Sequence, residues 1–212
     1  ADKDADGGFR NVDFDGYLTQ LNARRSPVAR RPQVAVVVAE GEISGGEQPA
    51  GRIGGVSTAA LLRAARDDDE VKAVVLRVDS PGGEVFASEQ IRREVVALKA
   101  AGKPVVVSMG DLAASGGYWI STPADHIVAH PSTLTGSIGI FGVINTVENT
   151  LGSIGVHTDG VSTSPLADVP TTKSLPPAVH PMMQMSTENA YKRSLTLVAN
   201  ARKSTPGKVD QL

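Results

Sequence analysis

The sequence contains no cysteine among its 212 residues. This absence excludes a disulfide framework, a thiol nucleophile and thiolate metal sites, although it leaves the redox compartment open. Long apolar runs are also missing: none approaches the roughly 20 residues that a membrane-spanning helix requires. No charged segment followed by an apolar one stands at the N-terminus as a leader. We therefore expect this chain by itself to be soluble.

The chain also has no large excess of positive or negative charge. Lys and Arg total 21 against 23 Asp and Glu, a net charge of -2, and no long basic run offers a phosphate-binding surface. Nucleic acid is therefore not an expected partner. No histidine pair with helical i, i+4 spacing and no acidic cluster supplies a ligand set, so neither a metal nor a cofactor is expected.

The length predicts one domain with one core. Residues 1–32 lack sustained periodicity and contain "ARRSPVARRP", which indicates a flexible arm or linker before a domain over residues 33–212. The chain opens without methionine. Near its end, Ser204 or Thr205 followed by Pro206 predicts the start of a helix only a few residues before the sequence stops. We expect a fragment of a longer protein, cut before its last elements.

Apolar runs rich in Val and Ile alternate with amphipathic segments along residues 33–212. Buried strands separated by helices are typical of parallel sheets with right-handed crossovers, so the pattern predicts an α/β fold. The expected strands cover residues 33–43, 71–80, 103–110, 125–131 and 156–162, and the expected helices cover residues 57–69, 85–102, 114–122, 144–155 and 175–204.

Two glycine pairs follow predicted strands. Gly82 and Gly83 lie in "RVDSPGGEV", and Gly116 and Gly117 directly follow Ser115 in "GDLAASGGYWIS". Glycine lets backbone N–H groups approach a developing oxyanion, and the strand ends of a parallel sheet form its ligand crevice. Either motif alone is also typical of a plain turn or of close packing. Together they favour Ser115 as a nucleophile, although "AASGG" fits only the loose form of the G-x-S-x-G elbow.

A serine nucleophile needs a base. None of the histidines stands in a diagnostic triad context, and most of the lysines are expected on solvated helix faces or element ends. Lys173 in "PTTKSLPP" is the lysine that a late loop could fold over the crevice, once desolvation lowered its pKa. The histidines are His126, His130, His157 and His180; the lysines are Lys3, Lys72, Lys99, Lys103, Lys173, Lys192, Lys203 and Lys208.

Four ordered motifs resemble the C-terminal half of the long-form signal peptide peptidase A family of serine proteases with a Ser/Lys dyad. They are "VLRVDSPGGEVFASEQI", "GKPVVVSMGDLAASGGYWIS", "STLTGSIGIFGV" and "SIGVHTDGVSTSPLAD". The resemblance runs from about Gln33 to the end of the chain. It implies a crotonase-like, Clp-protease-like superhelix of parallel strands and helices.

By this resemblance Ser115 is the nucleophile, Gly82 and Gly116 donate to the oxyanion, and Ser137 of "TGSIG" orients the base lysine. Short-form relatives carry that lysine after the "GV" strand, where this chain has Ser164 and Pro165 instead. In the long form the lysine comes from the homologous N-terminal half. The chain therefore resembles a half-site that is expected to show little or no peptidase activity alone.

The resemblance further implies a membrane-anchored homo-oligomer, a tetramer in the family, whose extracytoplasmic sites degrade cleaved, hydrophobic signal peptides. Two alternatives stay open at this stage. A crotonase-type acyl-CoA enzyme would need a carboxylate base, for which Asp111 and Glu84 are the nearby candidates. A non-catalytic scaffold would need no base.

Overall fold

The structure is a computed structural model that describes residues 14, 17, 32–164 and 171–211 of the chain. The arm predicted over residues 1–32 lies almost entirely outside the described residues, so the boundary between arm and domain stays a prediction.

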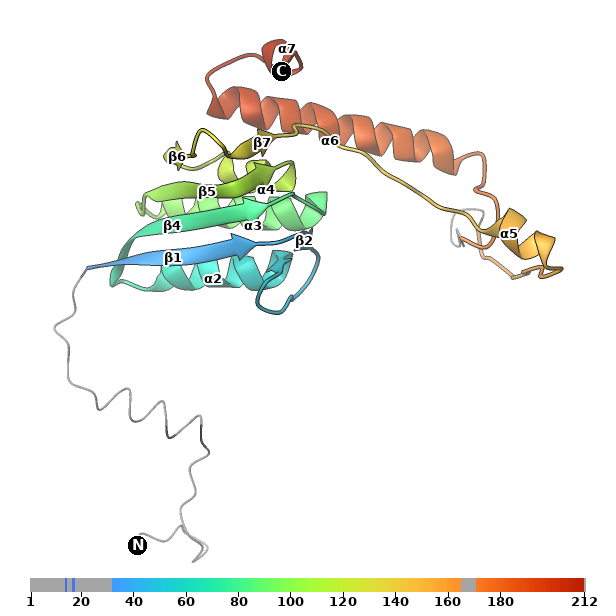
Figure 1. Cartoon of the computed structure of the whole chain (residues 1–212), viewed down its shortest axis with the longest axis horizontal. Helices are drawn as coiled ribbons and strands as arrows, with labels where there is room; N and C mark the ends of the chain where they lie inside the picture. Colours follow the sequence, from blue (N-terminus) through green and yellow to red (C-terminus); the bar gives the residue numbers. More distant parts are fainter. Residues whose placement is uncertain (1–13, 15–16, 18–31, 165–170, 212) are drawn as a thin grey trace, which may run out of the picture.

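A parallel sheet forms the centre of the molecule (Figure 1). Four of its 5 strands follow the order β1-β4-β5-β6. The fifth strand, β7, pairs with the carboxyl end of β5. Every pairing is parallel, which confirms the predicted α/β class. The strands are β1 (Gln33–Glu40), β4 (Val71–Ser80), β5 (Val105–Ala114), β6 (His126–Val128) and β7 (Leu134–Gly136), beside a separate parallel pair of β2 (Ile43–Ser44) and β3 (Ile53–Gly54).

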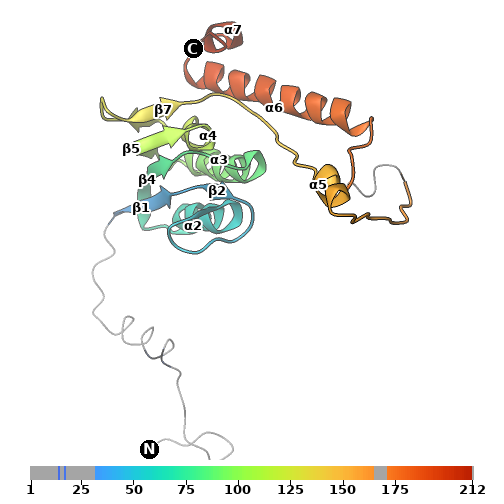
Figure 2. The same ribbon diagram turned by 45° about the vertical axis from the view of Figure 1, so that its right-hand side comes forward.

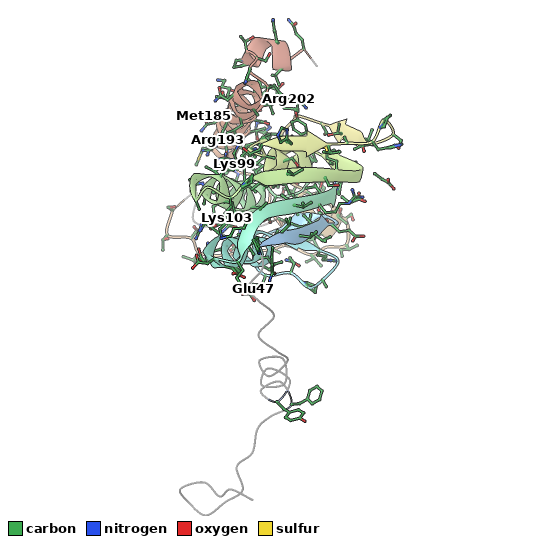
Figure 3. The ribbon with its side chains drawn as sticks, turned by 90° about the vertical axis from the view of Figure 1, so that its left-hand side faces the viewer. Glu47, Lys99, Lys103, Met185, Arg193 and Arg202 are labelled. Atoms are coloured by element: carbon green, nitrogen blue, oxygen red, sulfur yellow. The ribbon has the colours of Figure 1, made fainter. Side chains whose placement is uncertain are left out.

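Helices α2 (Gly55–Asp67) and α3 (Val85–Ala100) cover one face of this sheet (Figures 2 and 3). Each buries one apolar stripe at helical spacing, for example Ile91, Val95 and Leu98 of α3, which are 0% exposed. These side chains pack against the inward residues of β4 and β5 in a single core. The carboxyl ends of β4 and β5 stay paired through Ser80 and Ala113, with a register shift between Val78 and Ser80, and the glycine motifs follow those ends.

The C-terminal part of the chain packs on the same end of the sheet. The short helix α4 (Gly116–Ser121) directly follows β5, and the long helix α6 (Val179–Ala201) crosses it (Figure 1). Leu195 and Val198 are buried in the second half of α6, whereas its first half extends beyond the sheet toward α5 (Glu148–Ser153). Helix α7 (Pro206–Val209) begins at the predicted Pro206.

Most predicted elements form, but one predicted strand does not, and the short strands β3 and β7 were not predicted. The strand predicted over residues 156–162 is wrong, because these residues are exposed and pair with no strand of the described chain. Strand β7 was not predicted. It forms because Leu134, Thr135 and Gly136 align with Leu112, Ala113 and Ala114 of β5, a pairing between distant residues that local periodicity does not encode.

None of the helices within the described residues combines the length and the apolar character needed to cross a bilayer.

Candidate active site

Ser115 occupies a sharp turn between β5 and α4. Its backbone has φ 50 and ψ -116, a conformation that costs a non-glycine residue about 1–3 kcal/mol. Two backbone hydrogen bonds hold it there: the Ser115 N–H donates to Gly136 O at 2.9 Å, and the Trp119 N–H donates to Ser115 O at 2.8 Å. The side chain stands half-buried at the start of a helix, as a nucleophile at a strand-to-helix elbow does.

The "SPGG" turn lies directly against this elbow. A Cβ added to Gly82 would lie 2.5 Å from the Gly116 nitrogen and 2.8 Å from Ser115 Cβ, so the close approach requires glycine. Gly82 also has φ +102, which side chains rarely adopt. The turn and the elbow, 33 residues apart in sequence, therefore meet backbone to backbone.

The two glycines of the turn differ in whether their backbone N–H groups have a hydrogen-bond acceptor. Gly82 is buried, and its N–H donates to the Ser80 hydroxyl at 3.1 Å. Gly83 is exposed, lines the cavity beside Ser115, and donates its N–H to no group among the described residues. The resemblance assigns the oxyanion donor of this turn to Gly82, whereas in the structure the amide without a hydrogen-bond partner among the described residues is that of Gly83.

Gly116 completes the pair of amides. As the first residue of α4 its N–H has no intrahelical acceptor, and the helix dipole adds positive potential there. A Cβ on Gly116 would lie 3.2 Å from the Gly83 nitrogen and 2.6 Å from Ser88 Oγ. Ser88 is buried and donates its hydroxyl to Glu84 O at 2.8 Å, so it fills the space beneath the Gly116 backbone.

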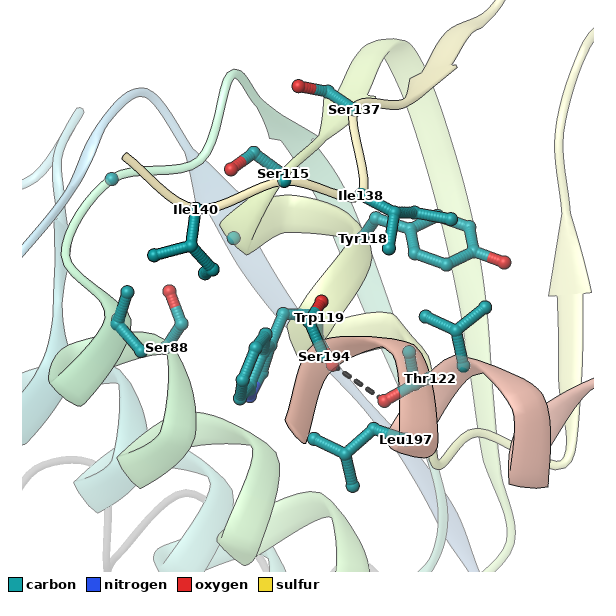
Figure 4. A pocket seen from close by; sticks show the side chains of 15 residues that line it. Ser88, Ser115, Tyr118, Trp119, Thr122, Ser137, Ile138, Ile140, Ser194 and Leu197 are labelled. Carbon is teal, nitrogen blue, oxygen red and sulfur yellow. Dashed lines mark hydrogen bonds between the residues drawn. The ribbon is translucent and has the colours of Figure 1, made fainter. Parts of the chain in front are cut away.

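A cavity of about 20 Å³ adjoins Ser115 (Figure 4). Ser115 and Ser137 lie in the upper part of the view, and Trp119 of α4 and Leu197 of α6 lie in the lower part. This volume is enough for about one water molecule. Its wall is mostly apolar and includes Ile138 and Ile140 from the extended segment after β7.

Ser137 lines the same cavity as Ser115. It has φ 49, and its carbonyl accepts the Gly139 N–H at 2.8 Å, so the chain bends there. The Ser137 hydroxyl makes no hydrogen bond with any other part of the chain that the structure describes.

No lysine, histidine or carboxylate of the described residues lines this cavity. Lys173 forms an ion pair with Asp159 at 3.5 Å, and neither residue lines the cavity of Ser115. Lys99 and Lys103 lie on the helical side of the sheet (Figure 3), where Lys99 pairs with Asp125 at 3.1 Å. A base for Ser115 is therefore not found within the described chain.

The histidines and the candidate carboxylates also lie elsewhere. His126 belongs to β6, and the imidazole of His130 is 2.7 Å from Ser132 Oγ on an exposed turn. Asp111 is exposed on β5, and the Glu84 carboxylate packs beside Gly45. Among the described residues, no three His, Asp or Glu side chains gather as a metal ligand set.

Glu89 connects its own helix, α3, with α4 and α6 through side-chain hydrogen bonds. Its carboxylate accepts hydrogen bonds from Trp119 Nε1 at 3.0 Å, from Arg92 at 2.7 Å and from Arg193 of α6 at 2.7 Å. Burial by itself would raise the pKa of Glu89, but the hydrogen bonds from Arg92, Trp119 and Arg93 outweigh it and lower the pKa to about 2. The carboxylate thus stays charged and holds α4 against α3 and α6.

Sequence reasoning missed three groups of residues around the site. Ser80 precedes the "SPGG" motif, but its role depends on the turn folding back onto its hydroxyl. Trp119, the single tryptophan of the chain, had a visible signal in its rarity. Ser194, Leu197 and Val198 of α6 had none, because only the packing of α6 on α4 brings them to the cavity.

The chain is similar to several known proteins. The model for Peptidase family S49 matches residues 97–212. The chain is 64% identical over 207 residues to Protease 4 of Salmonella typhi, covering 98% of this chain and 33% of that protein. It is 48% identical over 210 residues to Protease 4 of Haemophilus influenzae, covering 99% and 34%. It is 32% identical over 152 residues to a putative signal peptide peptidase SppA of Enterococcus faecium, covering 71% and 44%.

The fold is similar to that of a ClpP1 mutant from Listeria monocytogenes. The TM-score is 0.52 with 15% sequence identity, over 92% of this chain and 82% of that one. This likeness confirms the predicted Clp-protease-like fold. The chain spans about a third of the length of the two Protease 4 relatives.

Proposed function

Because this chain belongs to peptidase family S49, we propose that it carries the nucleophile and the oxyanion site of a serine peptidase. The observation that carries the proposal is the strained elbow of Ser115, which lies against the "SPGG" turn so that the Gly83 and Gly116 amides border the same cavity. A base is supplied from outside these 212 residues, as the N-terminal half of a long-form protein would supply a lysine.

The reaction follows from these groups. Ser115 Oγ attacks the carbonyl carbon of a peptide bond while its proton passes to the external amine base. The Gly83 and Gly116 amides donate to the oxyanion, and each such donor contributes about 10²–10³ in rate. The base returns the proton to the leaving amine, which leaves an acyl ester on Ser115. Water, deprotonated by the same base, then releases the acid and regenerates the serine.

Ser137 has a positioning role in this proposal. Its hydroxyl lines the cavity beside Ser115 and is free to accept a hydrogen bond from the incoming amine. Such a bond would orient the base toward Ser115 Oγ.

The substrate is a hydrophobic peptide, as a signal peptide is. Trp119, Ile138, Ile140 and Leu197 make the cavity wall apolar. Its small volume requires a shift of the segment that carries Ile138 and Ile140 before a side chain enters. That segment pairs with no strand among the described residues, so the shift breaks no sheet hydrogen bond.

The proposed assembly is an extracytoplasmic, membrane-anchored homo-oligomer that contains both halves. The acyl-CoA alternative lacks support, because neither Asp111 nor Glu84 lines the cavity and the enolate chemistry requires a carboxylate there. The labelling experiment below distinguishes a peptidase from the non-catalytic scaffold.

The test is labelling with a fluorophosphonate, which reacts with activated serines. We expect the full-length protein to be labelled at Ser115 and the label to be lost in Ser115→Ala. Ser132→Ala is the matched control, because Ser132 contacts His130 on an exposed turn but lies away from the elbow, and it should keep full labelling. The 212-residue chain alone should react at background rate. A full-length protein that neither reacts nor cleaves peptides would support the scaffold instead.

A further inference from the structure

A groove of about 620 Å³ lies beside the cavity of Ser115, between α3 and α6. Val85, Trp119 and Ile140 line both, so the groove continues from the nucleophile. Phe86 and Phe141 add apolar surface and are 73% and 87% exposed. Large exposed aromatic side chains beside a catalytic cavity are typical of a binding surface.

Two arginines line the same groove. Arg93 comes from α3 and Arg193 from α6, and their side chains are 69% and 51% exposed. Glu89 is the single carboxylate among the described residues that line it. An apolar surface with two guanidinium groups therefore borders the site.

The charges around Glu89 do not balance. Arg92 already makes a two-point contact with this carboxylate, at 2.7 and 3.0 Å. Arg93 adds one hydrogen bond at 3.1 Å and Arg193 adds one at 2.7 Å. Three guanidinium groups face one carboxylate, so two positive charges remain in excess.

Most donors of these two arginines remain available. A guanidinium has five N–H groups in a fork that matches a carboxylate. Beyond their bonds to Glu89, Arg93 and Arg193 make no hydrogen bond with the described residues. Glu89 holds both in place, so little side-chain entropy is lost when they bind an anion.

We propose that this groove binds the apolar end of the substrate peptide and that Arg93 and Arg193 bind a carboxylate at that end. The inference rests on the proposed function, because it names the class of peptide that Ser115 attacks. The carboxylate is the C-terminus of the peptide or an acidic side chain near it. Apolar peptides that carry such a carboxylate are thus selected over neutral ones.

The experiment measures peptide binding in the full-length Ser115→Ala protein, which binds without turnover. Three fluorescein-labelled peptides share one Leu/Ala sequence and end in a free carboxylate, in a carboxamide, or in a glutamate with a carboxamide. We expect the free acid to bind about tenfold more tightly than the plain amide. The glutamate peptide distinguishes the two sources of the carboxylate. If it binds as tightly as the free acid, the arginines accept a side-chain carboxylate as well as the C-terminus. If it binds only as weakly as the plain amide, they recognise the C-terminal carboxylate itself.

Arginine variants assign the preference to the groove. Arg93→Gln and Arg193→Gln should each reduce the ratio of acid to amide affinity severalfold, and the double variant should bring this ratio to about one. Arg193→Lys should retain part of the preference. Arg63→Gln is the matched control, since Arg63 of α2 pairs with Glu94 of α3, is 56% exposed, and lies outside the groove.

Equal binding of acid and amide, or a preference that survives the double variant, would overturn the inference. Cleavage assays on the wild-type protein separate this failure from that of the proposed function. Ser115-dependent cleavage without acid preference leaves the proposed function standing. Acid preference in binding without Ser115-dependent cleavage removes the peptidase proposal and leaves a carboxylate-binding groove.

Discussion

The Ser80 hydroxyl accepts the amide proton of Gly82 at 3.1 Å, inside the turn that faces Ser115. Ser80 is 0% exposed, so the bond is shielded from water. By engaging the first amide of the glycine pair it leaves the second, that of Gly83, as the donor beside the cavity. The hydrogen bond of a side chain at the end of β4 thus determines which backbone N–H of the turn is left without a partner beside the cavity.

The Ser80–Gly82 bond predicts the effect of Ser80→Ala. The substitution leaves a buried N–H without an acceptor, which should lower the free energy of unfolding by about 1–3 kcal/mol. Loss of the turn geometry should also slow fluorophosphonate labelling of the full-length protein about tenfold. Urea unfolding and the labelling rate measure the two effects. Ser121→Ala, which removes a buried hydroxyl that donates to Gly117 O, should leave labelling unchanged.

The contact between the turn and the elbow predicts a strong effect of Gly82→Ala. The added Cβ would lie 2.5 Å from the Gly116 nitrogen, at φ +102. We expect the free energy of unfolding to fall by about 2–4 kcal/mol and labelling to fall at least about 100-fold. Gly102→Ala is the control: it has φ +78 with open space around it and should cost about 1 kcal/mol with normal labelling. Equal effects of the two variants would contradict the proposed close approach.

Glu89 predicts a loss of stability in acid. The folded-state pKa of about 2 lies below the ordinary value of 4.5, so the stabilisation is complete above pH 4.5 and disappears as the pH falls toward 2. The side chain is 12% exposed, and the contribution should be about 2–3 kcal/mol. Urea unfolding at pH 6 and pH 3 should show this dependence in the wild-type chain and a smaller one in Glu89→Gln. If the free energy of unfolding fell equally between pH 6 and pH 3 in the wild-type chain and in Glu89→Gln, Glu89 would be excluded as the source.

Trp119 offers a local readout of the same titration. It is the single tryptophan of the chain and donates to Glu89 Oε2 at 3.0 Å. Its fluorescence should therefore change around pH 2, where the Glu89 carboxylate becomes protonated in the folded chain. The change should be missing in Glu89→Gln.

Lys173 should be dispensable for chemistry. Its ammonium pairs with Asp159, and Lys173 does not line the cavity of Ser115. Lys173→Ala should therefore leave the labelling rate at Ser115 in the full-length protein within about twofold of wild type. Measurable, Ser115-dependent turnover of a hydrophobic peptide ester by the isolated chain, lost in Lys173→Ala, would show instead that Lys173 is the base.

The sequence by itself determined most of the strands and helices around the sheet and the position of Ser115 between a strand and a helix. Hydrophobic periodicity, glycine pairs and the Pro206 helix start are local signals, so they survive without tertiary information. The motifs also identified the family, and the absence of a lysine after the "GV" segment was visible directly.

Only the tertiary structure decided the features that depend on contacts between distant residues. The hydrogen bond that engages the Gly82 amide depends on the Ser80 hydroxyl, and the Ser115 backbone depends on Gly136 of β7, which lies 22 residues beyond its partner in β5. The arginine groove depends on α6 packing against α3 through Glu89, an ion pair between residues 104 positions apart. Such pairings are set by the packing of the whole chain, and no local pattern encodes them.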